Sequence, residues 1–519
     1  MPTPVRCLHA KHGESPSSIG GPVRLALAAA VALLSAGPTI AQTPNETAAP
    51  ESAADSPTAV TRDPRPAPRV VPKDEKEDSG PKNYWVAPRS SGTQRDTEPP
   101  RYVRNLDQTG WFRGQGLDGI DFGLDFRCRY ERRDDDIRRN RPVLDEPLLT
   151  RWRGYLGVSK YLDPFRFYVE YEDAQRSNSQ FPKDDRDVNQ YEIIQAVAEL
   201  HFADALGSDR PLRLQAGRLA FEYGDRRLIA RNEWRNTTNN FQGFRAILGQ
   251  QRNDWQLDLL AVKPITRDLD SLDDPEHPRW FYGALGEWRR WSSVVTFQPY
   301  WLLLQQNTSQ GRTHLEKHTV GLRAYGQFGK SGFDWDLQGI HQFGDNGTRN
   351  VRTFATTSEA GYTFDHAWKP RPSLFFGYAS GDRNPSDGVD QRFDRLYGFA
   401  RPWSNDDYIT FDNLLAPKVR IEFQPHERLR IDGGYSAYWV DSKSDRWGGA
   451  NLNAGLSPAG QGSSFLGQEL DIRARIKIGD RLDLTLGYAY FMPGDFPENL
   501  GRGEDSDFFY VEIAPRLLP

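Results

Sequence analysis

Arginine residues alternate with apolar residues in several segments of this 519-residue chain. Arg127 and Arg129 alternate with apolar side chains in one segment, and Arg473, Arg475 and Lys477 do so in another. A guanidinium stays charged at any relevant pH and offers carboxylates a planar fork of donors. Side chains of this kind, repeated along a surface, could bind an anionic polymer through many weak sites and pass it from one site to the next.

This alternation also predicts the elements that hold these arginines. A period of two places one set of side chains on each face of a β-strand. Residues 120–131, 470–478 and 482–490 follow it, and Gly479-Asp480 predicts a hairpin turn between the last two. Similar segments are 165–171, 196–202, 212–216, 244–248, 255–261, 319–325, 333–339 and 429–439.

The length and charge of these segments favour a membrane barrel over a soluble sandwich. A tilted strand of about 9 to 11 residues crosses the hydrocarbon layer, and closure of the sheet satisfies every backbone group there. The mean hydropathy of -0.71 is too polar for a helical membrane protein. With weaker candidates included, we predict an all-β fold, a transmembrane antiparallel β-barrel of about 18 strands. Aromatic clusters at 280–282 and 300–301 suit its interfacial girdles.

The chain divides into three parts. Residues 1–41 read as a signal peptide, with basic residues before an apolar run at 25–34 that is too short to cross a bilayer. Residues 42–110 are rich in Pro, Ala, Ser and charges, and are expected to form a disordered periplasmic tail. Residues 111–519 are predicted to form the barrel. Cys128 would be alone after loss of Cys7, which excludes an intramolecular disulfide.

Three stretches carry a family resemblance. The first, 217–229, contains Gly217-Arg218 and Gly224-Asp225-Arg226-Arg227, and is followed by 233–237 and 241–245. The second comprises 377–385 and 393–398, and the third comprises 467–471, 491–495 and a last strand at 507–516. In order and spacing they resemble the alginate-export family of outer-membrane porins. The resemblance implies a channel in the bacterial outer membrane that conducts an anionic polysaccharide, such as a uronate polymer, out of the periplasm.

The resemblance further implies a constriction of arginine and lysine balanced by a few carboxylates, with a periplasmic loop that could gate it. Because lipid-facing residues are apolar, the residues that alternate with them should face the lumen. The predicted basic residues of the substrate path are Arg127, Arg129, Arg151, Arg153, Arg323, Arg473, Arg475 and Lys477, with Arg218, Arg226, Arg227, Arg235 and Arg245 from the family-like stretch. The predicted acidic balance is Asp125, Glu170 and Asp471.

Other functions remain open at this point. The charges could simply pair across strands in a general porin that takes up small anions or oligosaccharides. An outer-membrane hydrolase is a third candidate, although the chain has no G-x-S-x-G motif. We expect no catalytic residue, metal or cofactor, and His314 and His318 lack an evident third metal ligand. The expected partners are outer-membrane lipids, the anionic polysaccharide and periplasmic export machinery. Nucleic acid is not expected, since the net charge is -5, and we expect a monomer.

Overall fold

The computed structural model describes residues 97–518, apart from 111, 140–142, 290–291, 293, 310, 400–402 and 448–461. The predicted signal peptide and residues 42–96 lie outside the described residues. Among the described residues, no helix is long and apolar enough to span a bilayer.

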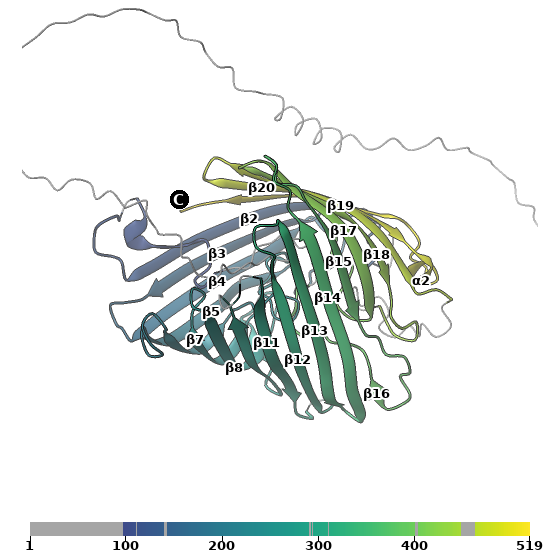
Figure 1. Ribbon diagram of the computed structural model, residues 1–519, viewed down its shortest axis with the longest axis horizontal. Coiled ribbons are helices and arrows are strands. Elements are labelled where there is room, and N and C mark those ends of the chain that lie inside the picture. The colour runs from purple at the N-terminus through teal and green to yellow at the C-terminus, as the bar shows by residue number, and fades with distance from the viewer. Residues whose placement is uncertain are drawn as a thin grey trace, which may run out of the picture. The chain divides into compact units, whose positions relative to one another are not determined.

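Within the described part of the chain, 18 long strands form one antiparallel sheet that closes on itself (Figure 1). Each strand pairs with the next along the chain, and the last pairs with the first. This confirms the predicted all-β transmembrane barrel. The strands are β2 (Ile120–Asp134), β3 (Leu148–Val158), β4 (Phe165–Ser177), β5 (Asn189–Phe202), β6 (Leu212–Leu219), β7 (Phe241–Gly249), β8 (Trp255–Thr266), β10 (Arg279–Trp288), β11 (Thr296–Gln306), β12 (Leu315–Gln327), β13 (Phe333–Asn346), β14 (Arg349–Tyr362), β15 (Arg371–Ala379), β17 (Leu414–His426), β18 (Leu429–Trp439), β19 (Phe465–Ile478), β20 (Leu482–Pro493) and β21 (Ser506–Pro515).

Short elements complete the described structure. They are β1 (Val103–Asn105), the 3-10 helix η1 (Leu106–Gln108), β9 (Asp274–Pro275), β16 (Val389–Asp390) and α2 (Asp495–Glu498).

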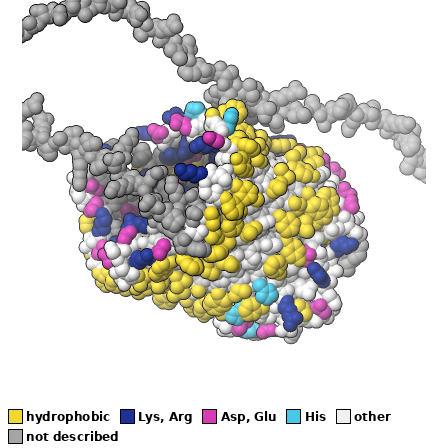
Figure 2. Space-filling view, in the orientation of Figure 1, with side chains coloured by type: hydrophobic (Ala, Val, Ile, Leu, Met, Phe, Trp, Pro, Cys, Tyr) yellow, Lys and Arg dark blue, Asp and Glu magenta, His cyan; other side chains and the backbone are white. Residues whose placement is uncertain are grey.

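The alternation of side chains gives the strands an apolar outer face and an inner face that holds the buried charged side chains together with some buried apolar ones. In β19, Leu470 and Ile472 are 50% and 53% exposed, whereas Arg473 is 3% exposed. Figure 2 shows the outer side chains as a broad apolar band, with charged side chains gathered at its edges. Because the period is two, a slip of one residue would bury the apolar row and turn the charges to lipid, so the pattern fixes the register.

The aromatic clusters divide between the two faces. Trp288 and Trp301 are 52% and 37% exposed, as residues of an interfacial girdle should be. Phe281 and Tyr300, which adjoin such residues in sequence, are buried inside the barrel instead. Strand alternation therefore assigns only every second residue of these clusters to the girdle.

Loop lengths distinguish the two ends of the barrel. The connections 135–147, 220–240, 380–413 and 440–464 all lie at one end, whereas the other end has short turns such as 427–428. In outer-membrane barrels the long loops face outward and the short turns face the periplasm. The end that carries 220–240 and 380–413 is therefore extracellular, and β2 begins and β21 ends at the periplasmic end.

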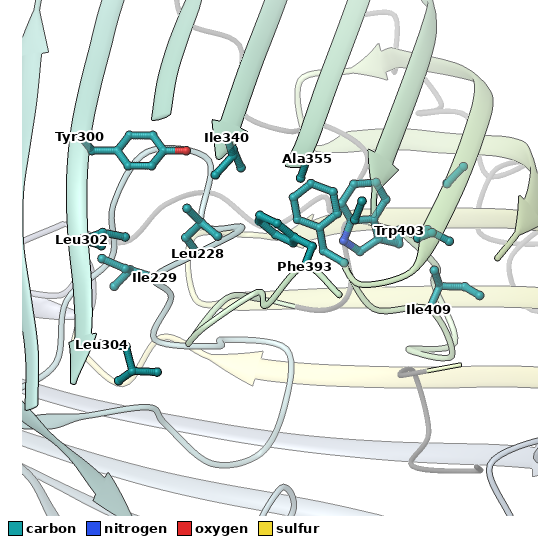
Figure 3. Close-up of a cluster of buried hydrophobic side chains, with 14 of the residues drawn as sticks. Leu228, Ile229, Tyr300, Leu302, Leu304, Ile340, Ala355, Phe393, Trp403 and Ile409 are labelled. Atoms are coloured by element: carbon teal, nitrogen blue, oxygen red, sulfur yellow. The ribbon is translucent and has the colours of Figure 1, made fainter. Parts of the chain in front are cut away.

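Two of the long loops fold back into the barrel, where their apolar side chains pack against the wall in a buried core. Figure 3 shows Leu228 and Ile229 of one loop, and Phe393, Trp403 and Ile409 of the other, near side chains of the barrel wall. All of these belong to one buried cluster, whose wall residues include Tyr300, Leu302, Leu304, Ile340 and Ala355. The lumen thus contains packed protein in this region.

The described structure includes part of the region that the sequence assigned to the tail. β1 and η1 lie within 42–110, the region expected to be a disordered tail. Val103 pairs with Gly123 of β2, while β21 pairs with β2 only from Cys128 to Asp134. β1 therefore satisfies backbone groups on a part of the β2 edge that β21 does not reach.

Candidate functional site

The family-like stretch forms the end of β6 and the loop 220–240. Gly217 has φ +129°, and a side chain there would collide with the carbonyl oxygen of Ala196 on β5. The neighbouring Arg218 pairs with Glu192 and donates to the carbonyl oxygen of Asp273 at 2.7 Å. The strand is therefore tied to its neighbours just before the chain turns into the lumen.

Arginines of β2 hold the loop by its backbone. Arg127 donates to the carbonyl oxygens of Glu233 and Arg235, at 2.5 and 2.8 Å. Arg129 donates to the carbonyl oxygen of Trp234 at 2.6 Å and stacks on its ring, 3.8 Å from the centroid. Both guanidinium groups are buried, so in this conformation they anchor the loop.

The carboxylate of Glu233 binds two further arginines. It accepts hydrogen bonds from Arg151 at 3.2 Å and from Arg153 at 3.0 Å, and Arg151 also lies 3.6 Å from Asp125. Arg151 pairs directly with Arg127 across β2 and β3, so a nearby carboxylate offsets their repulsion. Burial alone would raise the pKa of Glu233, but Arg153 and the other guanidinium groups hold that pKa well below its ordinary value.

Glu170 of β4 is a second anchor for the same loop. Its carboxylate oxygens accept hydrogen bonds from Arg231 of the loop, at 2.7 and 3.0 Å. The hydroxyl of Tyr102 donates to the same carboxylate at 2.6 Å. The side chain of Glu170 is fully buried. A segment before the barrel and a loop within it therefore share one carboxylate.

The two inward loops pair with each other. The amide of Tyr397 donates to the carbonyl oxygen of Leu228 at 3.0 Å, and the amide of Ala230 donates to that of Tyr397 at 3.1 Å. Gly398 is needed here, because a side chain at that position would collide with the carbonyl oxygen of Arg227. Further contacts between the loops join Arg226 to the ring of Phe399, Arg227 to the ring of Trp403, and Arg235 to Asp407.

A separate group of charges lies at the periplasmic end of β12 to β19. The carboxylate of Asp432 forms ion pairs with the guanidinium groups of Arg473 and Arg475, each with an N–O distance of 2.5 Å. Nearby, Lys418 pairs with Asp471, and Arg371 binds Glu359 at 3.0 Å. On β12, Arg323 donates to Asp336 and to Gln298, both at 2.9 Å. Lys477, at the end of β19, is exposed.

The structure thus brings some of the predicted residues together and separates others. Arg127, Arg129, Arg151 and Arg153 lie around the loop segment 233–236, which contains Arg235, whereas Arg323, Arg473, Arg475 and Lys477 lie on other strands. Arg245 of β7 binds Asp258 at 3.1 Å and Glu98 at 2.9 Å. That these residues form a substrate path stays a prediction.

Sequence reasoning missed several charged residues of the inner face. Arg133 continues the alternation of β2, and Lys418, Arg420 and Glu422 alternate in the same way in β17, so the period of two could have identified them. Glu233 lies inside a family-like stretch, but only the fold shows that several arginines converge on it.

Open space remains at both ends of the barrel. A cavity of about 510 Å³ at the periplasmic end is lined by residues that include Glu98, Arg166, Arg213, Arg231 and Arg245. A cavity of about 450 Å³ at the extracellular end is lined by residues that include Lys317, Arg349, Arg392, Arg395 and Arg446. The inward loops contribute to the walls of both cavities. In the part of the chain that the structure describes, no group of three or more His, Cys, Asp and Glu residues is placed to hold a metal ion.

Comparison with known proteins identifies both a family and a fold. Residues 118–510 match the family model described as alginate export. Among solved structures, the barrel is similar to three proteins of Pseudomonas aeruginosa. OccD3 (OpdP) is 12% identical with a TM-score of 0.55, covering 83% of this chain and 99% of its own. OccK8 (OprE) is 15% identical with a TM-score of 0.54, covering 76% and 97%. The outer membrane protein OprD is 10% identical with a TM-score of 0.51, covering 80% and 97%. A search of curated proteins gave no match.

Proposed function

The chain belongs to the alginate export family, and on this premise we propose that its barrel conducts an anionic polysaccharide of the uronate type out of the periplasm. The family and the closed barrel make it a channel of the bacterial outer membrane. The direction of transport and the chemical class of the polymer are what we propose.

One observation carries the proposal. The periplasmic cavity, where an exported polymer would enter, has a charged lining of five arginines, Arg101, Arg166, Arg213, Arg231 and Arg245, with four carboxylates among them. Guanidinium groups match the planar carboxylates of uronates and keep their charge at any relevant pH. A neutral sugar offers these groups no carboxylate that could exchange with their internal partners.

Acidic residues beside the arginines suit conduction. Arg245 is held by Asp258, and Arg473 and Arg475 share Asp432. A carboxylate of the polymer would compete with these internal partners and would therefore bind weakly at each step. Many weak sites favour passage, because a polymer that is bound too tightly cannot leave.

Passage also requires a change in the lumen. Loops 220–240 and 380–413 pack through an apolar core and lie between the two cavities. We take this arrangement as the resting conformation, from which the loops shift when polymer enters. We expect the barrel to work as a monomer in outer-membrane lipid and to receive the polymer from periplasmic export partners.

Ion selectivity in planar bilayers tests the basic lumen. We expect the wild-type channel to prefer anions, and the double substitution Arg475→Ala with Lys477→Ala to lower that preference about threefold, because two cationic side chains are removed from the inner face. Lys160→Ala is the matched control, since Lys160 lies on a periplasmic turn and pairs with Asp118 at 2.8 Å. The same reversal potential in the double variant and the wild type would contradict the proposal.

A further inference from the structure

A short segment before the barrel lies along the inner wall at the periplasmic end. Residues 97–102, here called the strap, precede β1, and residues 97–101 line the periplasmic cavity. Tyr102 reaches Glu170 on β4, and Glu98 reaches Arg245 on β7. The strap therefore runs past several strands of the wall and narrows the entrance that an exported polymer would use.

The contact between Glu98 and Arg245 has the chemistry expected of the substrate. Arg245 uses Nε and one terminal nitrogen for Asp258, and donates with the other terminal nitrogen to Glu98 at 2.9 Å. A uronate also presents a carboxylate, and one carboxylate can replace another at a guanidinium group. The side chain of Glu98 is 33% exposed and that of Arg245 is 4% exposed, so Glu98 is the partner that an entering carboxylate can reach from the cavity.

We propose that the strap is a tethered competitor, with Glu98 occupying at Arg245 the first carboxylate subsite of the export path. An entering uronate polymer takes this subsite and displaces the strap. This inference rests on the proposed function and adds the regulation of its entrance. A tethered group acts at an effective concentration on the order of millimolar. A polymer that carries many carboxylates can exceed this concentration locally, whereas a single uronate does so only when its concentration in solution is itself above the millimolar range.

The strap shares its anchors with the inward loop 220–240. Glu170 binds both Tyr102 of the strap and Arg231 of the loop. Arg245 binds Glu98 and also lies over the ring of Phe221, 4.9 Å from its centroid. Displacement of the strap therefore changes two contacts that hold the loop, and this links occupation of the entrance to opening of the lumen.

Two substitutions release the strap by different means. Glu98→Gln keeps the shape of the side chain and removes the competing charge. Gly123→Val leaves every charge in place, but a side chain at Gly123 would push against the ring of Tyr102 and against Val103. The controls are Asp118→Asn, which removes an exposed carboxylate paired with Lys160 at 2.8 Å, and Gly339→Val, where a side chain meets no atom within 4 Å.

The measurement is the block of channel current by an oligogalacturonate of about ten residues, added on the periplasmic side of a planar bilayer. We expect both strap variants to lower the half-blocking concentration about fivefold, while both controls match the wild type. The inference is overturned if the oligomer blocks the wild type and the strap variants at the same concentration. The proposed function itself fails if the oligomer does not block the wild type at all.

Discussion

Glu233 is one of the residues that hold the inward loop 220–240 in position. Its carboxylate meets Arg151 and Arg153, while Arg127 holds its backbone carbonyl oxygen. These arginines are buried, so they require a carboxylate to offset the cost of burying their charge.

Replacement of Glu233 should therefore release the loop. Glu233→Ala leaves buried guanidinium groups without their shared partner, which destabilises such sites by about 3 to 5 kcal/mol. We expect hydrogen exchange to rise across 220–240 and to stay unchanged in β13 and β14. Glu316→Ala is the control, because Glu316 has a side chain that is 41% exposed and pairs with His318 far from the loop in sequence. Unchanged protection of the loop in Glu233→Ala would show that the arginines do not hold it.

At the residue scale, the sequence identifies the arginines better than it identifies their partners. The period of two selects Arg127, Arg129, Arg473 and Arg475, because alternation assigns a face of the strand. It cannot assign their distant partners. Glu233 is 106 residues from Arg127, and Asp407 is 172 residues from Arg235. Those contacts depend on how the loops fold back.

At the scale of the elements, the loop 380–413 carries a carboxylate that makes its docking depend on pH. Burial raises the pKa of Asp406 to about 6. The folded loop therefore binds more protons than the free loop between about pH 4 and pH 6. Its docking loses stability as the pH rises through this window, and the loss levels off about one unit above the pKa of Asp406.

Hydrogen exchange measured at pH 5 and at pH 7 tests the pH dependence of the docking of this loop. We expect amide protection in 403–413, corrected for intrinsic exchange rates, to be higher at pH 5 than at pH 7. Asp406→Asn cannot ionise and should remove most of the difference. A pH dependence that is equally large in the Asn variant would assign the effect to other groups.

The strands themselves follow from local sequence more completely than the loops do. The predicted hairpin at Gly479-Asp480 joins β19 to β20, and the other alternating segments all fall within strands of the barrel. The segment 97–110 differs, because its composition is that of a polar tail while β1 and the strap gain their order from the barrel wall. Propensity alone cannot report such an edge pairing.

At the scale of the whole molecule, closure of the sheet is the property that the sequence predicts best. Strand length, an apolar outer row and a charged inner row together require a barrel in a membrane, because an open sheet would leave backbone groups unsatisfied in lipid. The strand pattern does not predict what fills the lumen. Leu228, Ile229, Phe393 and Trp403 form part of an apolar core inside the barrel, and nothing in the strand pattern predicts it.

The central claim is that this barrel passes a polyanionic sugar chain. The most direct test is the current through single channels in a planar bilayer, with a polyuronate or a neutral dextran of equal length on the periplasmic side. We predict reversible block by the polyuronate that strengthens when the voltage drives anions outward, and little block by dextran. Equal block by the two polymers, or none by the polyuronate, would contradict the account.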